Sequence, residues 1–417
     1  MNTKRLWILC KRLCSTLSVA VICVSLIASS CRPSSLPIRP ARISVVRNLV
    51  ESDSLALSTI VTCRMVGDAA LLALDPELRK IVSIDIPSGS ISDDIATSRI
   101  DLENLWQQAP DTIPEYYIMG RERGRKLSYL DALKYLQRDN TGIIIDGFDV
   151  YENDSILATA TIRFPYNETH DNGNRYVSHL MFAYAIKTRY RSDSTSAILL
   201  SPNMAENFCP VSFGVNVQGS KVWISAWDWK QMTEDGRLNE DDWWARSARY
   251  TRSGGFTGVV SREKPDYRDS GRYRQSSTWL ADGLDTTTFV RVVSTIPAVD
   301  VVNADNGSFV RIDLPSGTLS IRGSSFTTHP VRYGDGLLAV IFRETPPEEA
   351  RQRQFILIGK LGKQPPLIQW IGMYSFTTGD QLLSLVDTND SPLYRKDLLG
   401  IFENPDTGPY LARIEVE

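Results

Sequence analysis

Val310 to Ser320 reads V-R-I-D-L-P-S-G-T-L-S, and Val82 to Ser92 reads V-S-I-D-I-P-S-G-S-I-S. Seven of the eleven positions are identical, and three others exchange Ile for Leu or Ser for Thr. In each copy a strand-like alternation ends at Asp-x-Pro, Ser-Gly turns the chain, and a new apolar alternation begins. The phrase predicts strands and turns in a repeated arrangement. The alternative is chance similarity, because these are the common residues of any turn.

A second phrase sets a short turn before an apolar run: Gly67-Asp68 before Leu71 to Leu74, Gly334-Asp335 before Leu337 to Val340, Gly379-Asp380 before Leu382 to Leu385, and more loosely Asn153-Asp154 before Ile156-Leu157 and Gly219-Ser220 before Val222 to Ile224. Each turn lies between two apolar segments. This is the pattern of a β-hairpin in which Gly or Asn adopts a positive φ. Six such units begin near Ile60, Gly142, Val211, Thr286, His329 and Gly372.

The first thirty residues have the order of a secretory signal peptide. Four basic residues among the first twelve precede an apolar stretch, Leu13 to Ile27, and small residues follow from Ala28 to Ser30. The apolar stretch is shorter than the roughly 20 residues that a membrane-spanning helix needs. We therefore expect residues 1–30 to be removed on export. The alternative is an uncleaved N-terminal anchor.

The residues before Cys31 resemble the cleavage box of bacterial lipoproteins, in which the cysteine becomes the lipidated first residue. The strict box places Leu where Ala28 stands, so ordinary cleavage after Ser30 is the alternative. Pro and Ser are frequent after Cys31, which predicts that residues 31–42 form an extended tether. Several acyl chains on Cys31 would anchor the chain stably at the envelope. We expect an outer-membrane lipoprotein that faces the periplasm or the exterior.

The chain resembles the six-bladed β-propellers found among secreted lipoproteins of Bacteroidetes-type bacteria. The resemblance rests on the residues around Cys31, the turn-then-apolar hairpins and the final strand, and it covers roughly residues 43–417. It implies a closed ring in which Leu411 to Val416 completes a blade with the strand near Ser58 to Met65. The units are unevenly spaced and the fourth lacks the Gly-Asp turn. Seven blades, or a sandwich paired with a barrel, are therefore alternatives.

One segment departs from the strand pattern. Ser128 to Asp139 reads S-Y-L-D-A-L-K-Y-L-Q-R-D, with Leu130, Leu133 and Leu136 on one side at helical spacing. Ser128 and Asp131 form a capping box at its start. The sequence therefore predicts one short amphipathic helix inserted between the first two units.

The six cysteines give no framework of disulfides or metal ligands. Three leave with residues 1–30 and Cys31 would be acylated, so Cys63 and Cys209 remain. No CxxC or Cys/His cluster occurs, so no metal site is predicted. The two cysteines are far apart in sequence. We expect two buried free thiols, with one disulfide as the alternative.

The net charge and the motifs limit the classes of function that the sequence supports. The formal charge is −3 for the chain and −7 without residues 1–30, which carry four basic residues and no acid. Nucleic acid is therefore not an expected partner, and the lipid is the expected membrane contact. No nucleophile elbow, P-loop, zinc-protease or dinucleotide motif occurs, so neither catalytic residues nor a cofactor is predicted. We expect a binding or scaffold protein for a peptide, protein or glycan at the envelope. The alternative is a carbohydrate-active enzyme with paired carboxylates.

The expected ligand-binding residues lie between Trp223 and Arg252, which contain five of the nine tryptophans. Exposed Trp rings beside carboxylates suit sugar or peptide recognition, because the ring stacks while the carboxylate accepts hydrogen bonds. The predicted site is Trp227, Trp229, Trp243 and Trp244 with Asp241 and Asp242. The alternative is that these tryptophans fill an insertion packed against the domain.

Overall fold

The computed structural model describes residues 36–50, 60, 62–75, 80–92, 142–152, 154–169, 175–192, 195–200, 208–209, 214–229, 243–253, 255–259, 278–293, 298–315, 325–326, 328–344, 353–376 and 379–416. All regular elements in these ranges are strands, which confirms the predicted all-β class. The helix predicted over Ser128–Asp139 lies outside them. No helix within the same ranges is long and apolar enough to cross a membrane.

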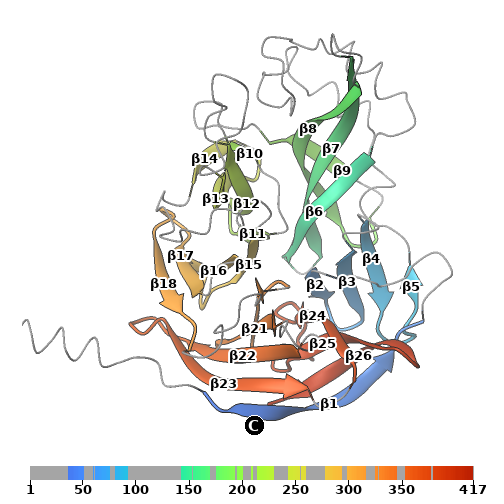
Figure 1. The fold of residues 1–417 in the computed structure, drawn as a ribbon, viewed down its shortest axis with the longest axis vertical. Coiled ribbons are helices and arrows are strands. Elements are labelled where there is room, and N and C mark those ends of the chain that lie inside the picture. Colours follow the sequence, from blue (N-terminus) through green and yellow to red (C-terminus); the bar gives the residue numbers. More distant parts are fainter. Residues whose placement is uncertain are drawn as a thin grey trace, which may run out of the picture.

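The strands form successive units along the chain (Figure 1). The first unit contains β2 (Thr62–Val66), β3 (Ala70–Asp75), β4 (Lys80–Asp85) and β5 (Ile91–Ser92). The second contains β6 (Gly142–Tyr151), β7 (Ser155–Thr169), β8 (Arg175–Arg189) and β9 (Thr195–Leu199). The third contains β10 (Phe208–Cys209), β11 (Val215–Gln218), β12 (Lys221–Trp229), β13 (Trp243–Thr251) and β14 (Phe256–Val259).

The remaining units continue this order. The fourth contains β15 (Thr278–Asp282), β16 (Thr288–Val293), β17 (Ala298–Asn303) and β18 (Phe309–Asp313). The fifth contains β19 (Ser325–Phe326), β20 (Val331–Tyr333), β21 (Leu337–Glu344), β22 (Arg353–Leu361) and β23 (Ile368–Phe376). The last contains β24 (Gln381–Asp387), β25 (Leu399–Asn404), β26 (Gly408–Glu415) and, from the other end of the chain, β1 (Ile38–Asn48). Pairing inside each unit is antiparallel, whereas the links β1–β23 and β2–β24 between units are parallel.

The apolar core lies between neighbouring units. Trp223 of β12 packs on Phe289 of β16 with ring centroids 4.9 Å apart, and similar clusters join the other neighbours. A further cluster joins the last unit to the first, so the units close into a ring, which is the architecture of a β-propeller. Because each sheet is covered on both faces, β21 is buried from Leu338 to Phe342 without alternation.

The ring closes with a different strand from the one predicted. The prediction that Leu411–Val416 completes a blade with the strand near Ser58–Met65 is wrong. β26 pairs instead with β1, in a register that sets Arg42 opposite Glu415. The N-terminal strand covers the edge that β26 would otherwise expose. β1 begins at Ile38, so it includes the end of the segment predicted as a tether.

The predicted hairpin turns occur in several units, at β2–β3, β11–β12 and β20–β21. Gly67, Gly219 and Gly334 have φ values of +61°, +59° and +55°. These values confirm the positive φ expected from the sequence. Gly379-Asp380 is the exception, because it links β23 to β24 and so connects two units.

Candidate functional site

The predicted tryptophan site lies on β12 and β13, and only its backbone is described. The antiparallel register sets Trp229 opposite Trp243 and Asp228 opposite Trp244. The side chains of Trp227, Trp229, Trp243 and Trp244 fall outside the described set, as do Asp241 and Asp242 entirely. The prediction that these six residues bind a ligand therefore stays a prediction. Nearby Trp223 is 1% exposed and belongs to the core.

A ring of polar side chains surrounds the centre of the propeller. Each unit contributes from its innermost strand, and these strands contact one another in cyclic order. We call this set the axial ring: Arg64 on β2, Asp149 on β6, Asn216 on β11, Asp282 on β15, Arg332 on β20, Asp387 on β24 and Asn389 just after β24.

Arg64 is the most buried cation of the axial ring. Its Nη1 atom lies 2.9 Å from Oδ1 of Asp149 and 2.7 Å from Oδ2 of Asp387, and all three side chains are at most 5% exposed. The other oxygen of Asp149 accepts a 2.6 Å hydrogen bond from the backbone N–H of Val217. These contacts tie β24, β2, β6 and β11 together.

Hydrogen bonds complete the ring on the opposite side. Asn216 donates to Asp282 at 2.8 Å, and Asn389 donates to the other oxygen of Asp282 at 3.2 Å. Arg332 donates to the carbonyl of Gly283 at 2.9 Å, and a longer contact of 3.4 Å reaches Asn389. Side chains thus link all neighbouring innermost strands.

Burial dominates the titration of the axial ring. It raises the pKa of Asp149 to about 8, although Arg64 opposes the shift. It also raises the pKa of Asp387, and the nearby charge of Asp282 raises it further, while Arg64 opposes the shift. Asp390, beside the ring, has a pKa raised to about 6 by burial and by Asp387. Burial lowers the pKa of His329, and Arg64 lowers it further, so its imidazole is neutral at pH 7.

The contacts of the axial ring hold neighbouring units together. Asp149 and Asp387 are the kind of carboxylate pair that the enzyme alternative requires, but both are ion-paired with Arg64 and at most 4% exposed. Among the described side chains, no group of three or more His, Cys, Asp or Glu residues is arranged to hold a metal ion. A substrate would have to displace buried ion pairs to reach these carboxylates.

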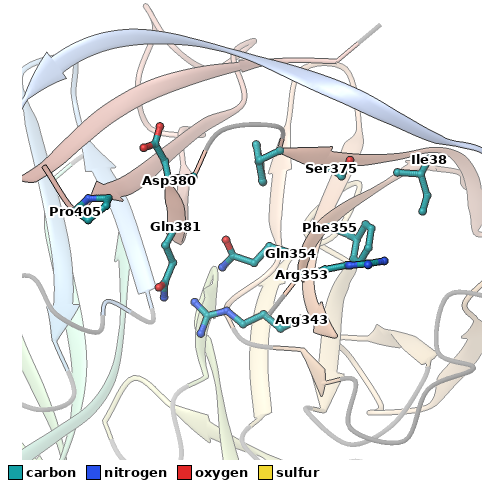
Figure 2. A pocket seen from close by; sticks show the side chains of 11 residues that line it. Ile38, Arg343, Arg353, Gln354, Phe355, Ser375, Asp380, Gln381 and Pro405 are labelled. Atoms are coloured by element: carbon teal, nitrogen blue, oxygen red, sulfur yellow. The ribbon is translucent and has the colours of Figure 1, made fainter. Parts of the chain in front are cut away.

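A cleft of about 770 Å³ lies between the fifth and last units. We call it the rim cleft (Figure 2). Phe355 of β22, Phe376 of β23 and Ile38 of β1 supply its apolar lining. Its polar lining comes from Arg343, Arg353, Gln354, Ser375, Asp380 and Gln381. Its volume falls within the range of small-molecule sites, roughly 300–1,000 Å³.

Arg343 and Gln354 lie at the junction of the two units. The amide of Gln354 both donates to and accepts from the backbone of Leu382, at 2.8 and 2.9 Å. The Arg343 guanidinium reaches the same carbonyl only at 3.4 Å, and its Nε atom is buried without a hydrogen-bond partner. Burial lowers the pKa of Arg343. In Figure 2 the ends of Arg343, Gln354 and Gln381 point toward one another.

Asp380 is the acidic residue of the cleft lining, and its oxygens are already engaged. One accepts a hydrogen bond from Asn404 at 2.5 Å, and the other accepts from the Tyr410 hydroxyl at 2.6 Å. Figure 2 shows its carboxylate directed away from Arg343. The sequence predicts a turn at Gly379-Asp380 and gives no signal for Arg343 or Arg353.

Comparison with known proteins gives structural likeness alone. No protein-family description matches the chain, and no curated protein matches its sequence. The NanB sialidase of Streptococcus pneumoniae is 10% identical, with 89% of this chain and 70% of that chain covered and a TM-score of 0.47. A protein of unknown function from Bacteroides thetaiotaomicron is 8% identical, with 90% and 76% covered and a TM-score of 0.44. The PQQ-bound aldose sugar dehydrogenase of Streptomyces coelicolor is 10% identical, with 92% and 100% covered and a TM-score of 0.43.

Proposed function

We propose that this chain is an exported, six-bladed β-propeller that is anchored by lipid on Cys31 and binds a peptide, protein or glycan at the cell envelope. Six blades are supported by the cyclic contacts of β2, β6, β11, β15, β20 and β24. Export is supported by the basic, apolar and small-residue order of residues 1–30. The anchor is supported by Cys31 and the Pro-rich residues after it.

The rim cleft is the observation that favours binding over hydrolysis. It has room for a ligand and mixes apolar walls with polar side chains, as binding sites do. A glycosidase needs two carboxylates that flank the bond it breaks. Asp380, the carboxylate in the described lining, is held by Tyr410 and Asn404, and no second carboxylate lines the cleft there.

Binding is tested by incubating the purified protein with arrays of envelope glycans and peptides. We expect retention of one ligand class without release of a cleavage product. If the Trp229→Ala protein still retains the ligand and a protein with a substitution in the rim cleft does not, the ligand binds in the cleft. Product release, or no retention on any array, would contradict the proposed function.

The lipid anchor has a separate test. Cys31→Ala should move the protein from the membrane fraction to the soluble fraction of the envelope, because acylation requires the thiol. Cys63→Ala is the matched control and should leave partitioning unchanged. Membrane association of the Cys31→Ala protein equal to that of the unmodified sequence would contradict the anchor.

A further inference from the structure

The N-terminal strand runs along the outside of three consecutive units. β1 pairs with β23 of the fifth unit over Ile38–Ala41 and with β26 of the last unit from Arg42 onward. Just beyond β1, the backbone N–H of Val50 donates to the carbonyl of Gly89 in the first unit, at 2.8 Å. We call residues 36–50 the outer strap. In Figure 1, β1 follows the outer edge of the ring beside β23 and β26.

Exposed aliphatic side chains gather on and beside the outer strap. Ile38, Val45 and Val50 are 54%, 60% and 62% exposed. Ile371 is also exposed, and it lies on β23, the strand that pairs with the start of the strap. These are four of the six large apolar side chains that the described residues leave exposed. A single exposed apolar residue needs no explanation, but such residues gathered in one region indicate a contact surface.

The outer strap is basic in a chain that is otherwise acidic. Its exposed basic residues are Arg39, Arg42 and Arg47. The strap contains no Asp or Glu, so it carries +3, whereas the chain without residues 1–30 carries −7 and the rest of that chain therefore −10. Two nearby carboxylates, Glu415 and Asp85, leave the region net positive. Basic and aliphatic side chains together are typical of segments that lie on anionic lipid, because the cations attract the headgroups and the apolar groups enter the boundary beneath them.

The distance from the lipid-bearing residue to the outer strap is short. Ile38 is already paired with Met373 of β23, and it follows Cys31 by only seven residues. Seven residues span at most about 25 Å. A lipid on Cys31 would therefore keep the ring close to the bilayer, and the strap is the part of the ring nearest to that anchor.

We propose that the outer strap rests on an anionic lipid surface, so that the propeller stands edge-on with its fifth, last and first units toward the membrane. This inference rests on the lipid anchor of the proposed function and adds a protein contact to the acyl chains. Val45 and Val50 enter the boundary below the headgroups, and the arginines contact the lipid phosphates. In Figure 1, β12 and β13 lie across the ring from β1, so the strands of the predicted tryptophan site face away from the membrane.

The test measures how fast single cysteines react with a water-soluble maleimide. The acylated mature chain is added to preformed vesicles of equal parts phosphatidylglycerol and phosphatidylcholine, or kept in dodecylmaltoside. Val45→Cys is the reporter, and Val310→Cys is the matched control, because Val310 is 50% exposed on β18 of the fourth unit. Cys63 is buried, and Cys209→Ser removes the other thiol from every variant. We expect Val45→Cys to react at least about tenfold more slowly on vesicles than in detergent, since a thiol covered by lipid is shielded from the reagent. Val310→Cys should react equally in both.

A second comparison separates lipid contact from mere closeness to the membrane. Arg47→Gln should raise the labelling rate of Val45→Cys on vesicles about fivefold, which corresponds to the contribution of about 1 kcal/mol from one basic residue at an anionic leaflet. Vesicles of phosphatidylcholine alone should raise the rate in the same direction. Arg252→Gln is the matched control and should have no effect, since Arg252 pairs with Glu152 on the second and third units.

Three results would overturn the inference. They are equal slowing of Val45→Cys and Val310→Cys on vesicles, slow labelling of Val45→Cys in detergent as well, or protection that neither Arg47→Gln nor uncharged lipid reduces. Slow labelling in detergent would show that a second copy of the chain covers the strap. If the acylated protein stays on the vesicles while Val45→Cys reacts at its detergent rate, the strap contact is wrong and the lipid anchor stands. If the chain is not acylated, or leaves the vesicles, both proposals fail.

Discussion

Arg64→Met removes the guanidinium that Asp149 and Asp387 share at the centre of the ring. The substitution keeps an unbranched apolar stem but leaves two carboxylates, each at most 4% exposed, without their cation. Breaking a buried ion pair by removing one partner costs about 3–5 kcal/mol. We expect a loss of unfolding free energy in that range at pH 8, because both carboxylates lose the same guanidinium.

The loss should depend on pH in a definite direction. Without Arg64, the folded-state pKa values of Asp149 and Asp387 rise further above the value of about 3.9 for unfolded Asp. The folded variant then holds more protons than its unfolded state, so its unfolding free energy falls as pH rises. The penalty relative to the unmodified sequence should therefore be larger at pH 8 than at pH 5.

Urea unfolding of both proteins at pH 5 and pH 8 measures these differences. Arg413→Met is the control, because Arg413 pairs with Asp397 at 2.8 Å but the two side chains are 44% and 26% exposed. An exposed pair of this kind is worth about 1 kcal/mol or less. A cost for Arg64→Met no greater than the control, or one that is unchanged between the two pH values, would refute the role assigned to the axial ring.

Three further predictions concern other buried or constrained groups. Burial raises the pKa of Asp149 to about 8 and that of Asp390 to about 6, so the stability from their protonated forms is present below about pH 4 and is lost as pH rises through these values. The urea midpoint of the unmodified protein should therefore be higher at pH 5 than at pH 8.5. A midpoint that is higher at pH 8.5 would contradict this prediction. Gly89→Ala should lower the free energy of unfolding by more than the roughly 1–2 kcal/mol expected for Gly67→Ala. Both glycines have positive φ, but a Cβ at Gly89 would lie 2.2 Å from a backbone oxygen, whereas a Cβ at Gly67 would meet open space. Equal urea unfolding curves for the two variants would contradict this difference. The Cys63 thiol, whose pKa burial raises, should react with a thiol reagent only in denaturant, and fast labelling of the folded protein would show that it is accessible.

Sequence reasoning succeeded where structure depends on neighbouring residues. The turns at Gly67, Gly219 and Gly334 were predicted because a positive φ is a local demand that Gly meets. The same local chemistry also explains the failure at Gly379-Asp380. A turn between two units looks like a turn within one, and the partners that fix Asp380 lie on β25 and β26.

The likeness between Val82–Ser92 and Val310–Ser320 is also local. Its first copy joins β4 to β5, inside a unit, and Asp85 accepts a hydrogen bond from the Ser88 backbone N–H at 2.9 Å. Its second copy begins on β18, which is already the outer strand of its unit. The two copies hold different places in the fold. Their likeness therefore does not mark equivalent positions in two blades.

The sequence contains a partial signal for the axial ring. Arg64 lies within Thr62–Val66 and Asp149 within Gly142–Tyr151, so each is a charged residue inside an otherwise largely apolar strand. Such a residue predicts a buried partner. Which partner it meets depends on how the units align around the centre, and spacing along the chain does not contain that information. Arg343 was missed for the same reason, since Leu382 reaches it from another unit.

β1 connects closure of the ring with the rim cleft. It pairs in parallel with β23 over Ile38–Ala41 and antiparallel with β26 from Arg42 onward, so one strand joins the last two units. Ile38, at the start of this strand, also lines the cleft. The axial ring holds the opposite, innermost side of the same units through Arg332 and Asp387. Substitutions at the cleft therefore change an outer wall and leave the buried charges of the axial ring in place.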